Sequence, residues 1–572
     1  MSAGRPGGAA TAVVGTVGPW KPVLLLYTAL TILFTWPLGH DPAGTVLAVG
    51  PDANLFMWTL GWDVHAFLAQ PLAIFDANIY YPFTNTLAYS ENLIGSAVFA
   101  APVIWATGNL ALALNVVEML SVVLCAMGTY VLARRMGLSP LAAALAGLIF
   151  AFSPARFFRT GQLHQGPVQW IPFGLAALHA YLGGGRRRDL WLACAFFSLQ
   201  ALTSGHGAAF ITLAYALLIL HHLAARRPLT LMRRVRDLGV TGLALLAPSA
   251  LLYLPYRRAQ TEMGLKRSLE NWVVTPESFI ASPAHVHQWL LAQFSGAPVA
   301  ETASAFLFPG YLPLVLAAAV LLWPRRAVQT STADTADGAP GPPVATAVVG
   351  AMLAVAGWWL ALGPPVGIWP LVYDWPGLSF VRVPSRFLVV GMLGLSLLAG
   401  FGADRVFHRV RPRGRRPLAL ALGAWLVIEF AAFPLQVVAA NVDPPAADRW
   451  LASLSGPVVV AELPLADPRN AGAFERRQTE VMLHTTAHWH KTVHGYSGIR
   501  PPFHEALYDI MRSFPDEACL DRLRDVGVTH IVVHPDWYAA GEWPSVQDRI
   551  QARRDRLELR FSSPDGRVYE LR

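Results

Sequence analysis

Eleven apolar runs follow one another along this chain, most of them long enough to cross a bilayer as a helix. A spanning helix needs about 20 mostly apolar residues. Hydrophobic residues make up 54% of the sequence and charged residues only 14%, well below the roughly one quarter usual in soluble domains. We therefore predict a mainly α, polytopic transmembrane helical bundle of about 11 spans. The runs lie near 20–38, 110–132, 139–153, 166–182, 189–204, 207–225, 238–256, 305–323, 344–362, 386–403 and 417–437.

The basic residues between these runs indicate the orientation. With a cytoplasmic N-terminus, the predicted inner loops hold twenty Lys and Arg residues and the outer loops before residue 440 hold eight. Cytoplasmic loops retain Lys and Arg, so this bias supports the assignment. It requires 92–107 to be an interfacial or re-entrant helix rather than a full span. The chain is expected in the inner (cytoplasmic) membrane of a bacterium.

The predicted domains follow from the same orientation. Residues 1–19 are rich in Gly, Ala and Thr and are expected to be a disordered cytoplasmic N-terminus, while 20–440 form the transmembrane domain. An odd number of spans places the remaining residues, 441–572, outside the membrane. That tail has strand-like runs at 458–461 and 529–533, a helical stretch near 517–525 and a hairpin pattern at 557–572. We predict a small extracytoplasmic α/β domain.

The first outer loop, 39–109, contains no Lys or Arg but several acids and many aromatic residues. Aromatic side chains favour the membrane interface. A carboxylate there can accept a proton from a hydroxyl or bind a divalent cation such as Mg²⁺ or Mn²⁺. Asp52 and Asp76 are the candidate catalytic residues, ahead of Asp63 and Glu91. The alternative is that these acids cap helices or keep the loop outside.

Arginine residues in other outer loops are candidates for binding a phosphate. Guanidinium groups hold phosphate through paired N–H donors, although anionic lipid headgroups would explain the same residues. His206 also faces outward, where a helix-capping turn is the alternative to a substrate contact. The candidate substrate-binding residues are Arg156, Arg159, His164, Gln165, Arg382 and Arg386.

Other functions find less support in the sequence. The Arg residues fall between apolar runs, as topology requires, and so the net charge of +8 does not indicate nucleic-acid binding. The three cysteines give no disulfide framework. His484, His488, His490 and His494 lack a recognised zinc spacing, so no metal ligand is predicted among them.

Taken together, several motifs resemble the GT-C superfamily, which comprises membrane glycosyltransferases that use polyprenyl-phosphate sugars. The predicted order of segments in this chain also resembles that superfamily: one span, a long outer loop with an early Asp, many further spans and an outer C-terminal domain. The motifs are Asp52 with Trp58 and Trp62, Tyr80-Tyr81-Pro82-Phe83, Arg159 with His164-Gln165, Arg382-Val383-Pro384-Ser385-Arg386-Phe387, His488 with Gly495-Tyr496-Ser497-Gly498, and Gly527-Val528-Thr529-His530-Ile531-Val532-Val533-His534.

The resemblance implies an inverting sugar transfer from a polyprenyl-phosphate donor to an acceptor hydroxyl at the outer face. The first-loop acid of the family maps to Asp52, and its phosphate-binding residues map to outer arginines such as Arg382 and Arg386. Many members have two adjacent acids where this chain has Asp52-Ala53, which leaves metal use and catalytic competence open. The alternatives are a transporter, for which the intramembrane acids Glu118 and Glu429 would be candidates, and a non-catalytic protein of cell-envelope assembly.

Overall fold

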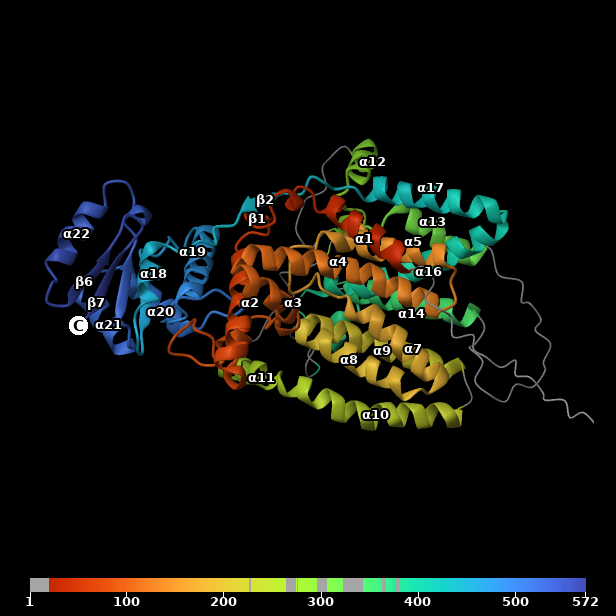
Figure 1. Ribbon diagram of the computed structural model, residues 1–572, viewed down its shortest axis with the longest axis horizontal. Coiled ribbons are helices and arrows are strands. Elements are labelled where there is room, and N and C mark those ends of the chain that lie inside the picture. The colour runs from red at the N-terminus through yellow and green to blue at the C-terminus, as the bar shows by residue number, and fades with distance from the viewer. Residues whose placement is uncertain are drawn as a thin grey trace, which may run out of the picture.

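The computed structural model describes residues 20–225, 228–263, 274, 276–295, 306–322, 343–362, 367–373, 375, 381 and 383–572. The molecule is elongated, with a helical bundle at one end and an α/β domain at the other (Figure 1). The helices α2 (Asp52–Ala69) and α3 (Ile94–Thr107) lie between these two parts. The predicted disordered segment 1–19 and the candidate Arg382 fall outside the described residues.

The bundle contains a helix at each of the predicted apolar runs. Because these runs carry few polar side chains, their backbone groups are best satisfied within the helix itself. The helices are α1 (Trp20–Phe34), α4 (Leu110–Arg135), α5 (Pro140–Phe152), α7 (Trp170–Gly184), α8 (Arg187–Thr203), α9 (Gly205–Ala225), α10 (Pro228–Leu251), α13 (Tyr311–Leu322), α14 (Pro343–Ala361), α16 (Leu388–Arg409) and α17 (Pro412–Phe430). Shorter helices are α6 (Pro154–Phe157), α11 (Leu254–Glu262), α12 (His285–Ser295) and α15 (Trp369–Val372).

Three stretches of helix among the described residues are long and apolar enough to cross a membrane. They are Leu110–Arg135, Gly205–Ala224 and Pro384–Arg409. Five apolar helices are shorter, including α1, α5 and α3, which has 14 residues. The mainly helical membrane class agrees with this finding, while the count of eleven spans stays a prediction.

Helix α10 starts before the apolar run near 238–256. It begins at Pro228 and contains Arg233, Arg234 and Arg236. The Arg234 side chain donates a hydrogen bond to the carbonyl oxygen of Gly183 at 2.9 Å. Arginine is a good helix former, so a basic segment next to an apolar run can continue the same helix.

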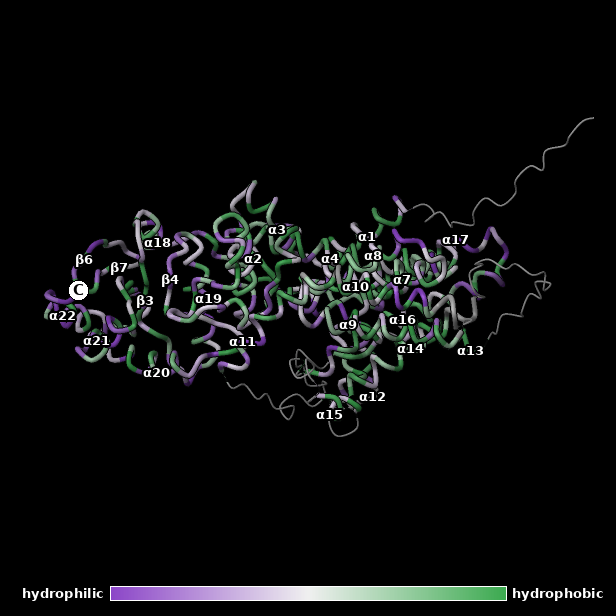
Figure 2. The backbone as a smooth tube through the Cα atoms, turned by 90° about the horizontal axis from the view of Figure 1, so that it is seen from below, coloured by the Kyte–Doolittle hydropathy of each residue, from purple (hydrophilic) through white to green (hydrophobic). Residues whose placement is uncertain are grey.

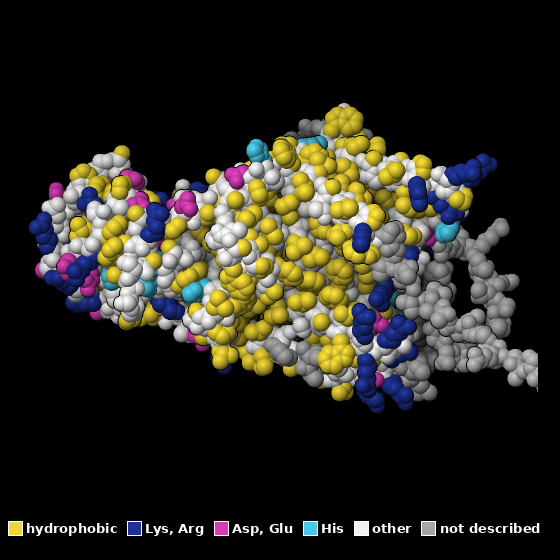
Figure 3. Space-filling model, in the orientation of Figure 1, with side chains coloured by type: hydrophobic (Ala, Val, Ile, Leu, Met, Phe, Trp, Pro, Cys, Tyr) yellow, Lys and Arg dark blue, Asp and Glu magenta, His cyan; other side chains and the backbone are white. Residues whose placement is uncertain are grey.

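The bundle is held together by close helix packing, and its outer surface is apolar. A Cβ atom built on Gly357 of α14 would lie 2.1 Å from the backbone nitrogen of Gly391 in α16, so these helices approach as closely as small residues allow. Leu243, Leu321 and Leu420 are each more than 70% exposed. Hydrophobic side chains cover the visible face of the bundle, and basic ones gather near its far end (Figure 3). An apolar surface of this extent is suited to contact with lipid.

The α/β domain contains a five-stranded sheet with the order β4-β3-β5-β7-β6. Strands β4, β3 and β5 are parallel, and β7 runs antiparallel to β5 and β6. The strands are β3 (Val459–Leu463), β4 (Lys491–Thr492), β5 (His530–Val533), β6 (Leu557–Ser562) and β7 (Arg567–Leu571). The helices are α18 (Ala446–Leu451), α19 (Ala471–His484), α20 (Pro502–Met511), α21 (Glu517–Val526) and α22 (Trp543–Gln551). The core packs Ala461, Leu463, Ile531 and Val533 against Leu520 and Leu523.

The predicted strands, the helix and the hairpin of the tail coincide with β3, β5, α21 and the β6–β7 pair. After residue 440 the sequence changes from long apolar runs to a mixture of apolar and polar residues, and this change is also visible in the fold. Hydrophobic residues dominate the bundle, whereas hydrophilic residues become frequent along the α/β domain (Figure 2).

The first outer loop and the segment after α17 are bonded to each other. Strand β1 (Thr45–Leu47) pairs antiparallel with β2 (Val437–Ala439). Farther along the loop, the backbone N–H of Tyr81 donates to the carbonyl oxygen of Thr492 at 2.9 Å, and that of Thr492 donates to Asn78 at 2.7 Å. The loop therefore covers the β4 edge of the sheet and lies at the same end of the bundle as the α/β domain.

This arrangement generates a topology prediction. All three native cysteines are buried, so an Ala540→Cys variant would carry an exposed thiol in the α/β domain. We expect an impermeant maleimide to label it once the outer membrane is permeabilised, with the inner membrane intact. Arg413→Cys, at an exposed position near the start of α17, is the control and should react only after the inner membrane is breached. If Arg413→Cys reacts while the inner membrane is intact and Ala540→Cys does not, the predicted orientation is wrong.

Candidate active site

Asp52 opens α2 at the end of the bundle that faces the α/β domain (Figure 1). Its Oδ1 accepts a hydrogen bond from the hydroxyl of Tyr496 at 3.3 Å. Burial raises the pKa of the Asp52 carboxyl, and the charge of Glu475 adds to this effect. The Tyr496 hydrogen bond and the positive charge of Arg386 oppose it. A carboxyl with a raised pKa is a stronger proton acceptor than an exposed aspartate.

Arg386 lies on the short helix η6 (Pro384–Phe387) that leads into α16. Its Nη1 is 2.5 Å from Nε2 of His206, and Nδ1 of His206 is 2.6 Å from Oε1 of Glu91. Because a guanidinium can only donate, Nε2 accepts, and the proton of a neutral ring lies on Nδ1, where it is donated to Glu91. A histidine thus connects a half-buried cation to a half-buried anion.

Glu91 is the anion of this chain of hydrogen bonds. Its Oε2 accepts the backbone N–H of Gly205 at 2.7 Å. Burial alone would raise the pKa of Glu91, but the hydrogen bonds from His206 and Gly205 and the charge of Arg386 hold it below its ordinary value. Both oxygens are therefore engaged, and the loop before α3 is fastened to the start of α9.

Arg159 contributes a second cation to the same corner. Its Nη1 donates to Oε1 of Gln165 at 2.7 Å, and Nε2 of Gln165 lies 2.6 Å from Nε2 of His164. The ring of His164 is 6.2 Å from that of His206. Burial, together with the positive charge of Arg386, lowers the pKa of Arg159 to about 9. Two guanidinium groups thus belong to one corner of the molecule, and their combined charge favours an anion there.

Two predicted site residues lie apart from this cluster. Arg156 is buried and donates to the carbonyl oxygens of Ala151 and Gly166, at 2.9 and 3.0 Å, so it braces the turn between α5 and α7. Oδ1 of Asp76 accepts the backbone N–H of Asn85 at 2.7 Å, which folds the first loop. These contacts are structural, and a role for either residue in catalysis or substrate binding stays a prediction.

The structure brings Asp52, Arg159, His164, Gln165 and Arg386 to one corner of the molecule through the contacts described above. It adds Glu91 and His206, which the sequence analysis named as weaker candidates, and Tyr496, which it named only within a motif. Tyr496 belongs to the Gly-Tyr-Ser-Gly motif of the tail. The contact between His206 and Glu91 joins residues 115 positions apart, and no local sequence pattern marks it.

The carboxylates at this corner are not arranged to bind the divalent cation that acids of the first outer loop could bind. Both oxygens of Glu91 accept hydrogen bonds, and the Arg386 guanidinium already supplies positive charge to Asp52 and Glu91. A cation site needs converging oxygens that a guanidinium does not already neutralise.

No protein-family model matches the sequence, and no curated protein matches it by sequence. Among solved structures, arabinofuranosyltransferase AftD from Mycobacteria matches with a TM-score of 0.57 and 16% identity, over 96% of this chain and 40% of that chain. AftD is a GT-C glycosyltransferase. The chain has the GT-C fold. The resemblance inferred from the sequence is therefore confirmed at the level of fold.

This chain spans about two fifths of the length of AftD. Two further matches are looser. The oligosaccharyltransferase of Archaeoglobus fulgidus has a TM-score of 0.47 and 13% identity, over 90% of this chain and 69% of that chain. ArnT from Cupriavidus metallidurans, bound to undecaprenyl phosphate, has a TM-score of 0.45 and 14% identity, over 96% of this chain and 97% of that chain.

The hydrogen-bond chain through Glu91 predicts a loss of stability on mutation. Glu91→Gln removes the countercharge of Arg386 and replaces one acceptor oxygen by an N–H donor. We expect this change to cost about 1–3 kcal/mol, the usual effect of leaving a buried polar group unsatisfied. The midpoint of thermal unfolding in detergent should fall by several degrees. Glu505→Gln, at an exposed position on α20, is the control. Equal midpoints for the two variants would contradict the assignment.

Proposed function

We propose that this protein is a membrane glycosyltransferase of the GT-C type. It transfers a sugar from a polyprenyl-phosphate donor to an acceptor hydroxyl at the outer face of the cytoplasmic membrane. The observation that carries this proposal is that Arg159 and Arg386, linked through Gln165, His164 and His206, lie at one corner with the raised-pKa carboxyl of Asp52. Such a corner offers positive charge for a phosphate and a base for a hydroxyl.

The arginine pair supports a site for the donor phosphate. Arg159 is only 6% exposed, so an anion beside it would be attracted through a medium less polar than water. His164 and Gln165 fix the position of Arg159, and His206 fixes that of Arg386. Binding a phosphate between the two cations would relieve their repulsion. The same positive charge would stabilise the polyprenyl phosphate as it leaves.

Asp52 supplies the base in this proposal. The oxygen of the acceptor hydroxyl forms a bond to the anomeric carbon of the sugar, from the side opposite to the phosphate. The bond between that carbon and the phosphate oxygen breaks, and its electron pair stays on the polyprenyl phosphate. The proton of the acceptor hydroxyl passes to Asp52. The Tyr496 hydroxyl, 3.3 Å from Oδ1, orients the carboxylate for this transfer.

Removing the base tests the reaction. Asp52→Asn keeps the shape of the side chain and removes its basicity, so sugar transfer should fall by roughly two to four orders of magnitude. In the wild type, the rate should rise with pH as the raised pKa of Asp52 is passed, because only the ionised form accepts a proton, and the variant should lack this rise. Asp41→Asn, at an exposed position in the same loop, is the control. If Asp52→Asn transfers sugar at the parent rate, Asp52 is not the base. The base would then be Asp76, or the proposed reaction would be excluded.

Arg386 tests the donor site. Arg386→Lys keeps the charge but loses the planar pair of N–H donors. The affinity for a polyprenyl phosphate in detergent should fall by roughly ten- to a hundredfold, the value of a charge-assisted hydrogen bond. Arg257→Lys, which alters an exposed arginine on α11, should bind normally. If a double variant, Arg159→Ala with Arg386→Ala, binds polyprenyl phosphate as tightly as the parent, then the two residues do not bind the donor. Their role would be to contact lipid headgroups or to pack against the protein.

A further inference from the structure

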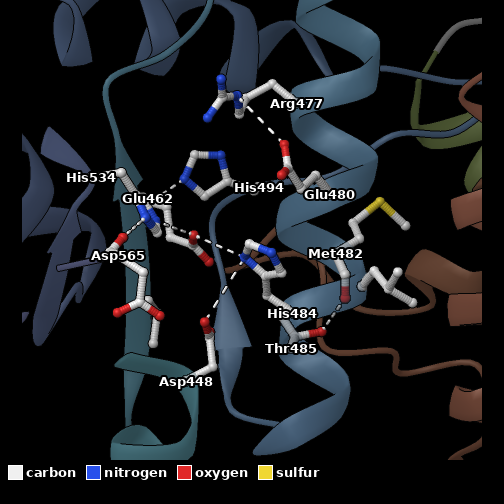
Figure 4. Close-up of polar contacts among 12 residues, drawn as sticks. Asp448, Glu462, Arg477, Glu480, Met482, His484, Thr485, His494, His534 and Asp565 are labelled. Atoms are coloured by element: carbon white, nitrogen blue, oxygen red, sulfur yellow. Dashed lines mark hydrogen bonds and ion pairs between the residues drawn. The ribbon is translucent and has the colours of Figure 1, made fainter. Parts of the chain in front are cut away.

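A second cluster of ionisable side chains lies inside the α/β domain, and the proposed sugar transfer does not use it. Asp448 comes from α18, Glu462 from β3 and His484 from the last turn of α19. One ligand atom of each lies within 4.8 Å of the other two. Figure 4 shows the three side chains pointing toward one another from these separate elements.

The cluster is buried, and its charges meet through long ion pairs of His484 with Glu462 and Asp448 rather than through hydrogen bonds. Asp448 is fully buried, Glu462 is 1% exposed and His484 is 8% exposed. Neither carboxylate oxygen of Asp448 has a hydrogen-bond partner, and Nδ1 of His484 has none. A buried charge without hydrogen bonds is costly, and buried charges are usually paired closely or bound to a metal ion.

The separations within the cluster fit metal ligands better than hydrogen bonds. Nδ1 of His484 lies 3.6 Å from Oε2 of Glu462 and 3.8 Å from Oδ2 of Asp448. Both distances exceed the range of about 2.7–3.2 Å for a hydrogen bond from nitrogen to oxygen. Two ligands bound tetrahedrally to zinc at about 2.0–2.2 Å are about 3.3–3.6 Å apart. The separation from Glu462 lies at the upper end of that range and the one from Asp448 slightly above it.

A neighbouring histidine, His534, holds Glu462 in this orientation, and a second, His488, faces Asp448. Nε2 of His534 is 2.8 Å from Oε2 of Glu462, and its Nδ1 is 2.8 Å from the carbonyl oxygen of Asp565. His488 accepts the backbone N–H of His490 at its Nδ1, and its Nε2 faces Oδ1 of Asp448 at 3.5 Å. Partners of this kind commonly fix the ligands of metal sites.

We propose that Asp448, Glu462 and His484 bind one divalent metal ion of the zinc type. Two carboxylates and one neutral imidazole would balance its charge, and this set of ligands suits Zn²⁺. Three protein ligands leave the fourth position of a tetrahedral ion to water, and the burial of all three favours a role in holding the fold. The ion joins α18, β3 and α19, and so fixes the face of the domain that meets α2.

The test measures metal directly and does not depend on glycosyltransferase activity. The full-length protein, freed of any purification tag, should retain about one equivalent of zinc per chain by mass spectrometry. Zinc added to chelator-treated protein should restore a raised midpoint of thermal unfolding, because a ligand that binds only the folded state stabilises it. Co²⁺ in its place should give the visible absorption of a tetrahedral site.

Variants of the proposed ligands, compared with a control histidine variant, test where the ion binds. Asp448→Asn and His484→Gln should each lower zinc affinity by on the order of a hundredfold or more. Such a loss exceeds the one expected when only a residue that hydrogen-bonds to a metal ligand is removed. His530→Gln alters a half-buried histidine of β5 beside Thr529 and should bind zinc like the parent. Absence of both stoichiometric metal and a zinc-dependent midpoint in the parent protein would overturn the proposal. So would equal zinc binding by Asp448→Asn and His530→Gln.

Discussion

The pairing of the half-buried Glu91 carboxylate with His206 is the interaction on which the candidate active site depends. It fastens the loop before α3 to the first residues of α9 through Gly205 and His206. His206 in turn contacts Arg386 at the start of α16. One anion therefore sets the relative positions of three segments that are far apart in sequence. It also offsets part of the charge of Arg386, whose repulsion with Arg159 would otherwise be larger.

The first outer loop connects the bundle to the α/β domain by two kinds of contact. Backbone hydrogen bonds from Tyr80 and Tyr81 continue the β4 edge of the sheet, so that this edge is covered. Side-chain packing adds to this, since a Cβ atom built on Gly495 would lie 2.5 Å from the ring of Tyr80. Only glycine allows so close an approach. The next residue, Tyr496, is consequently held with its hydroxyl at Asp52.

The sequence predicts the helices well because each apolar run has few alternatives to a helix in a membrane. It does not mark the start of α10, because Arg233 and its neighbours extend that helix ahead of the apolar run. Asp52, Arg159 and Arg386 could be identified as candidates, since acids and arginines in outer loops are conspicuous. The bond between Glu91 and His206 could not, because it depends on how the loop before α3 meets the start of α9. Asp448, Glu462 and His484 escape detection for a similar reason, since three separate elements supply them.

The helix α19 links the α/β domain to the chemistry proposed at Asp52. It packs against α2, which begins with Asp52. Oε1 of Gln478, on α19, accepts the backbone N–H of Gly495 at 3.1 Å and so fixes the turn that presents Tyr496. His484 ends the same helix. A displacement of α19 would therefore move both the Tyr496 hydroxyl and the surface that supports α2. The α/β domain thus supplies Tyr496 to the candidate active site, and the position of α19 governs where that hydroxyl lies relative to Asp52.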